Sequence, residues 1–173
     1  MIEIEWKYLN KVLNELGVEI TTTYRRELEQ AKKNASHQLS NSFATFVKTE
    51  GENMTLYASL PYYWKYLEFG TRSAIGHPKG KFPPVSAIEE WIKVKPVVPF
   101  KMKNGKLPTT RQLAFLIARA IQERGTRPFY FLTKAIPSNN EIQRKINASV
   151  TADVEDWIYK MINYEINKDL IAK

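Results

Sequence analysis

A glutamate, an arginine and a histidine lie within ten residues of one another near the middle of this chain, at Glu68, Arg72 and His77. A carboxylate among aromatic rings can act as a general acid or base, or can hold a divalent cation for phosphodiester hydrolysis. These three residue types therefore suggest a metal-dependent nuclease that uses Glu68. Such enzymes usually need several converging carboxylates, and residues 61–135 contain only four acids.

A structural role for Glu68 competes with the catalytic one. Glu68 follows Tyr66 and Leu67, and two basic residues, Lys65 and Arg72, lie nearby in sequence. A carboxylate that accepts hydrogen bonds from an arginine or from loop amides commonly does no chemistry. We therefore favour a structural Glu68 and predict no catalytic residue.

The sequence also predicts neither a metal site nor a cofactor. It has no cysteine, and its two histidines, His37 and His77, are too far apart to show metal-ligand spacing. Gly76, Gly80 and Lys81 suggest a phosphate-binding loop, but their spacing differs from that of a P-loop, and two prolines soon follow the lysine.

Positive charge is concentrated in the middle of the chain. The net charge is +8, and residues 61–135 hold fourteen basic and four acidic side chains, a local excess of ten. Such a region attracts a phosphate backbone or an acidic protein, although a solvated loop is the more common explanation. The candidates for contact with a partner or with DNA are Arg72, Lys79, Lys81, Lys101, Lys103 and Lys106.

Five aromatic rings fall within Tyr62–Phe69, immediately before Gly70. We predict that this segment is the centre of the fold and that its rings pack against helices farther along the chain. The predicted structural core comprises Tyr63, Tyr66, Leu67, Phe69, Gly70, Trp91, Phe115, Ile117, Ile121, Phe129 and Phe131.

Apolar periodicity predicts an α+β fold with a small, twisted, mainly antiparallel sheet, several packed helices and a long C-terminal helix. Helical spacing covers residues 5–16, where Gly17 is expected to end the helix, and then 18–39, 61–70, 84–92, 109–124 and 140–168. Residues 43–49 and 53–60 are predicted to form the two strands of a hairpin, because apolar residues alternate along the second stretch and the connection between them is short. Residues 94–108, rich in lysine and proline, read as a flap.

The length of 173 residues suggests one domain, 1–173, in which residues 1–17 form either an arm or part of the body. The first six residues include two acids where a signal peptide would carry lysines, and no run is long and apolar enough to cross a bilayer. We therefore expect a soluble protein without a membrane partner.

The order of several segments resembles the neck proteins of tailed bacteriophages, which join head to tail and are also called tail-completion or minor tail proteins. The resemblance covers roughly residues 20 to 165 and is sharpest in Tyr66–Arg72 and Arg124–Ala135. Between them lie a loop ending in Pro83-Pro84, a short helix with Trp91, and the helix around Phe115. The lysine- and proline-rich 94–108 insert departs from the family's pattern.

The resemblance implies a non-enzymatic virion subunit that is assembled in the host cytoplasm. Such a subunit would form a homo-oligomeric ring in the neck, between portal-side adaptor or head-closure proteins and tail proteins. Passing DNA would contact it without sequence preference. A DNA-binding module and, less favoured, the nuclease remain the alternatives.

Overall fold

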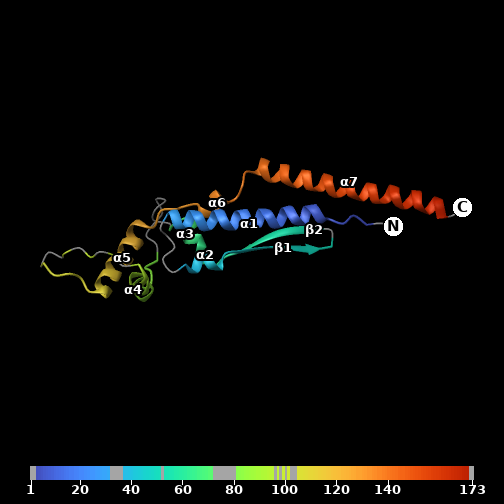
Figure 1. Ribbon diagram of the computed structural model, residues 1–173. Coiled ribbons are helices and arrows are strands. Elements are labelled where there is room, and N and C mark those ends of the chain that lie inside the picture. Colours follow the sequence, from blue (N-terminus) through green and yellow to red (C-terminus); the bar gives the residue numbers. More distant parts are fainter. Residues whose placement is uncertain are drawn as a thin grey trace. The chain divides into compact units, whose positions relative to one another are not determined.

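The computed structural model describes residues 3–31, 37–51, 53–71, 81–95, 97, 99, 101 and 105–171, with side chains described as far as residue 167. These residues form a mixed α+β structure, as predicted. Figure 1 shows the elements in order: α1 (Lys7–Gln30), α2 (Gln38–Ser42), β1 (Ala44–Glu50), β2 (Asn53–Ser59), α3 (Trp64–Glu68), α4 (Val85–Val94), α5 (Thr110–Arg124), α6 (Phe131–Ala135) and α7 (Asn139–Ile171).

The chain divides into two compact units. The first comprises Met1–Thr23, Ala44–Ser59 and Ala135–Lys173, and the second comprises Tyr24–Phe43 and Leu60–Lys134. Helix α1 therefore contributes its longer N-terminal part to the first unit and its last two turns to the second.

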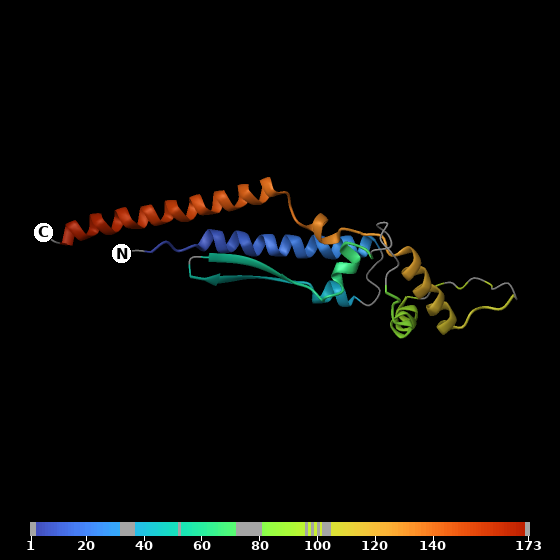
Figure 2. The ribbon, with the colours of Figure 1, turned by 180° about the vertical axis from the view of Figure 1, so that it is seen from behind.

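In the first unit, α1 lies between the hairpin and α7 (Figures 1 and 2). Strands β1 and β2 pair antiparallel without interruption, from Ala44 opposite Ser59 to Glu50 opposite Asn53, which confirms the predicted hairpin. Alternate residues of each strand are half-buried on the face toward α1, while their neighbours are exposed, as expected for a sheet with one covered face.

Gly17 does not end a helix, contrary to the prediction, because α1 continues through it to Gln30. A Cβ atom at Gly17 would lie 2.7 Å from Thr45 Oγ1 and 3.2 Å from Leu56 Cδ1. The glycine is therefore required by the close approach of the hairpin to α1. The second helix predicted from Val18 is the rest of α1, followed by the separate short α2.

Helices α1 and α7 run antiparallel, as their polar contacts show. Lys145 Nζ donates to Glu19 at 2.8 Å, and Lys160 Nζ lies 3.6 Å from Glu5. Between these pairs the buried Asp153 carboxylate accepts hydrogen bonds from the backbone N–H groups of Tyr8 at 2.8 Å and Leu9 at 2.9 Å. Asp153 thus caps the N-terminus of α1 from another helix and interacts favourably with its dipole.

Replacing Asp153 with alanine should destabilise the first unit by about 2 kcal/mol, because two amides at the start of α1 lose their acceptor. Denaturant unfolding followed by circular dichroism measures this change. Asp156→Ala is the matched control, since Asp156 is half-buried on the same helix and forms an ion pair with Lys160. Equal effects of the two substitutions would contradict the capping role.

In the second unit, α4 and α5 pack on one another through small and branched side chains. Ile88, Ala114 and Ala118 are buried, and half-buried Val85, Ile92, Ile117 and Ile121 surround them. Helix α5 begins at a capping box between Thr109 and Gln112, which explains why its start was predicted correctly.

Two predicted core anchors are not in this core. Trp91 is 41% exposed and Phe115 is 50% exposed, so the prediction is wrong for both in the single chain. The small side chains of Ala114 and Ala118 bring α5 close to α4, and the larger rings are left on the outer surfaces.

The largest buried rings of the second unit come from three separate elements. Tyr24 of α1 stacks on Phe43 at a centroid distance of 4.5 Å and meets Phe131 of α6 edge-on at 6.5 Å. Phe131 is buried, as predicted, and stacks on the half-buried Phe129 at 5.5 Å. In the described part of the chain, no helix combines the length and apolar character needed to span a membrane.

Candidate assembly interface

Helix α3 is joined to α6 by one buried side chain, that of Glu68. Its Oε2 accepts a hydrogen bond from the Leu132 N–H at 2.8 Å, and its Oε1 accepts from the Thr133 N–H at 3.0 Å and from Thr133 Oγ1 at 2.7 Å. Glu68 is only 3% exposed. The carboxylate therefore caps the N-terminus of α6, as Asp153 caps α1, and its acceptors are directed at protein donors.

Backbone hydrogen bonds extend this junction on both sides of Glu68. The Phe129 N–H donates to Leu67 O at 3.0 Å, and the Tyr130 N–H donates to Glu68 O at 3.3 Å. Farther along, the Thr71 N–H donates to Thr126 O at 3.1 Å, and Thr71 Oγ1 accepts from the Thr126 N–H at 2.7 Å. The two segments 67–71 and 126–133 thus bind to each other.

Gly70 lies at the closest point of this pairing. Its φ is +68°, and an added Cβ would lie 2.3 Å from Thr126 O and 2.9 Å from Pro128 N. Both the left-handed backbone and the contact with another backbone segment exclude a side chain here. The predicted structural role of Gly70 is thereby explained by its geometry.

Tyr24 packs beside this junction, and its ionisation is suppressed. Burial, followed by the negative charge of Glu68 and by Tyr63, raises the pKa of the Tyr24 hydroxyl well above its usual value. Burial also raises the pKa of Tyr63. The neutral phenol of Tyr24 is therefore the form that the folded chain retains.

The free energy of unfolding should fall as pH rises above about 10, the usual pKa of tyrosine. The unfolded chain releases the Tyr24 proton there while the folded chain keeps it, so this group contributes a loss of about 1.4 kcal/mol per pH unit. Denaturant titrations from pH 8 to 11 should show a smaller slope for Tyr24→Phe. Tyr66→Phe, at an exposed ring, should keep the wild-type slope, and equal slopes for all three chains would contradict the effect.

Four of the five rings of the aromatic segment are exposed and Trp64 is half-buried, which corrects the prediction that these rings form the core. Tyr62 is 72% exposed, Tyr66 53% and Phe69 52%, and Tyr63 is also exposed. A five-residue helix can bury only one side, and in α3 that side carries Glu68 and the half-buried Leu67. We call the exposed set Tyr62, Tyr63, Tyr66 and Phe69 the aromatic surface.

Neighbouring side chains hold the aromatic surface in place. Tyr62 and Tyr66 meet edge-on at 6.4 Å, and the Lys65 ammonium lies 5.0 Å from the centre of the Tyr62 ring. Trp64 lies 5.8 Å from Phe69. Rigid aromatic side chains beside a cation are typical of residues that contribute most to protein–protein binding.

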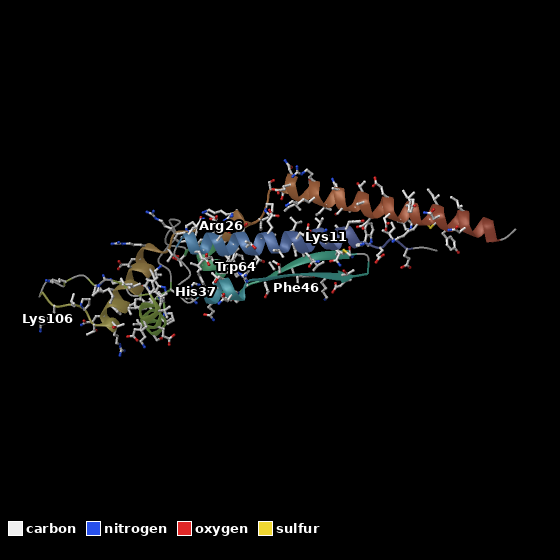
Figure 3. The ribbon with its side chains drawn as sticks, in the orientation of Figure 1. Lys11, Arg26, His37, Phe46, Trp64 and Lys106 are labelled. Carbon is white, nitrogen blue, oxygen red and sulfur yellow. The ribbon has the colours of Figure 1, made fainter. Side chains whose placement is uncertain are left out.

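The predicted basic contacts fall in two groups. Lys81, Lys101 and Lys106 are exposed, and Figure 3 shows Lys106 on the connection that leads into α5. Arg72, Lys79 and Lys103 lie outside the described residues, as do His77 and residues 96, 98, 100, 102 and 104 of the predicted flap.

Among the residues that the structure describes, no three histidine or acidic side chains gather as ion ligands. No protein-family model, curated protein or solved structure matches this chain. The interface is therefore interpreted from its own geometry.

Sequence reasoning missed Tyr24, Phe43 and Asp153 as organising residues. Tyr24 was part of the predicted apolar stripe, but nothing in its spacing distinguished it from its neighbours. Asp153 had the clearer signal, because it is an acid between Val150 and Val154 on the otherwise apolar face of a long helix. A charge at such a position requires a buried partner.

Proposed function

We propose that this chain is a structural subunit of a ring in the neck of a tailed bacteriophage, where it joins the head side to the tail and leaves a passage for DNA. The observation that carries the proposal is the aromatic surface on a segment whose backbone is fixed by Glu68 and Gly70. These hydrogen bonds fix the backbone of a segment whose rings are exposed. Such a preorganised surface is suited to binding another protein.

Exposed apolar side chains elsewhere in the chain support an assembly role. Among the described residues, twenty-one large hydrophobic side chains are exposed, whereas twelve hydrophobic residues are buried. They occur in both units, including Phe46 and Tyr57 on the hairpin and Ile162 on α7. Several separate apolar surfaces fit a ring subunit, since each copy must contact two neighbours through different surfaces.

The contacts of Glu68 give the nuclease alternative little support. Both carboxylate oxygens accept hydrogen bonds from α6, and the side chain is buried. The DNA-binding alternative is favoured by the exposed lysines 81, 101 and 106, and a ring around DNA would also use them. A ring subunit and a DNA-binding module differ in oligomeric state and in their selectivity for DNA sequence.

Sedimentation equilibrium and negative-stain imaging of the full chain test the proposal. We expect closed rings of several copies, and Tyr66→Ser combined with Phe69→Ser should raise the subunit dissociation constant at least about tenfold with unchanged helix content. Val18→Ser, at a 66% exposed position on α1, is the matched control. A chain that stays monomeric at high concentration and binds DNA sequence-selectively would overturn the proposal.

A further inference from the structure

The hairpin has two strand edges with which no other described strand pairs. Within the described residues the sheet consists of β1 and β2 alone, so each strand of seven residues pairs on one side only. Unpaired strand edges present backbone N–H and C=O groups in register for another strand. A two-stranded sheet is also only marginally stable by itself.

The hairpin carries few of the features that usually prevent strand addition. The ladder is regular from Ala44–Ser59 to Glu50–Asn53, and neither strand contains a proline. The single lysine, Lys48, forms an ion pair with Glu50 of the same strand. Strand β2 carries no charged side chain, so no like charges oppose its approach to β1 of another molecule.

The two faces of the hairpin determine which strand could be added. The inner face, toward α1, carries Val47 opposite Leu56, and the outer face carries Phe46 stacked on Tyr57 at 5.4 Å. Phe46 is 50% exposed and Tyr57 41% exposed, and Figure 3 labels Phe46 on the hairpin. A matching strand must place apolar residues inside and an aromatic residue outside, and β2 itself has this pattern.

We propose that β1 of one copy pairs antiparallel with β2 of the next copy, in the register that the two strands use within the chain. Each added copy then continues the inner apolar row and the outer Phe–Tyr row, and closure of the ring leaves no edge unpaired. This inference rests on the proposed function and names one contact between its subunits. The partner is a second copy of this chain because the complementary edge is present on the same hairpin.

The absence of cysteine makes this pairing directly testable. Lys48 and Thr55 are register partners and are exposed on the outer face. Two single variants, Lys48→Cys and Thr55→Cys, are prepared separately, mixed under conditions in which subunits exchange, and oxidised to form a disulfide, which requires Cα atoms within about 7 Å of each other. A covalent dimer is expected from the mixture, and neither variant alone should give one.

Val18→Cys mixed with Thr55→Cys is the control, because Val18 is exposed on α1 and belongs to the same unit. Sedimentation of the unmodified chain distinguishes failure of the strand pairing from failure of the ring proposal. Oligomers without the 48–55 cross-link, or a dimer formed by one variant alone, would overturn the strand pairing and leave the ring proposal standing. A strictly monomeric chain would overturn both.

Discussion

Replacing Glu68 with alanine should lower the free energy of unfolding by about 4 kcal/mol, because two backbone amides of α6 lose a charged acceptor and a cavity replaces the buried side chain. Glu68→Gln keeps the size of the side chain but places an NH2 group against one of the two N–H donors. It should therefore recover only part of the loss. Thermal and denaturant unfolding of the full chain measure both effects.

Glu90→Ala is the matched control for this prediction. Glu90 is an exposed acid in the same unit, on α4, so its removal should change stability by less than about 0.5 kcal/mol. If Glu68→Ala were as stable as Glu90→Ala, the capping role would be wrong. A magnesium-dependent nuclease activity lost in Glu68→Gln would instead restore the catalytic alternative.

Replacing Gly70 with alanine should also cost about 4 kcal/mol or more. The left-handed backbone contributes about 1–2 kcal/mol of strain for a residue with a Cβ, and the Cβ would collide with Thr126 O, a backbone atom that cannot rotate away. The segments 67–71 and 126–130 must then separate, and their hydrogen bonds are lost. Denaturant unfolding should show this loss, and near-UV circular dichroism should show the loss of ordered tyrosine packing.

Gly51 separates the two contributions to this cost. It lies in the hairpin turn with a φ of +59°, and nothing lies within 4 Å of the position of its Cβ. Gly51→Ala should therefore cost only the backbone strain, about 1 kcal/mol. Equal losses for Gly51→Ala and Gly70→Ala would show that the contact with Thr126 is unimportant.

Local patterns predicted local structure well in this chain. The alternation of apolar residues along 53–60 predicted the hairpin. Thr109, three residues before Gln112, is a typical N-cap residue and indicated the start of α5. The long C-terminal helix was predicted by its apolar repeat. Each of these signals depends on residues a few positions apart, where side-chain direction follows from the backbone alone.

The prediction of the core was wrong at several positions where it was inferred from ring size. Tyr66, Phe69, Trp91 and Phe115 are the kind of side chains that cores contain, yet they are exposed here. The residues that organise each unit are instead Glu68 and Asp153, which cap helices 64 and 145 residues away in sequence. No spacing rule links such distant partners, so only the folded chain reveals them.

Holding α3 by Glu68 and Gly70 has a consequence for how this protein can change over generations. The bonds that maintain the segment use its backbone and one carboxylate, whereas the rings of Tyr62, Tyr66 and Phe69 are exposed. Mutations can therefore alter those rings without undoing the fold. Descendants of this chain could acquire new binding partners through α3 while the Leu67-Glu68 and Gly70 positions stay the same.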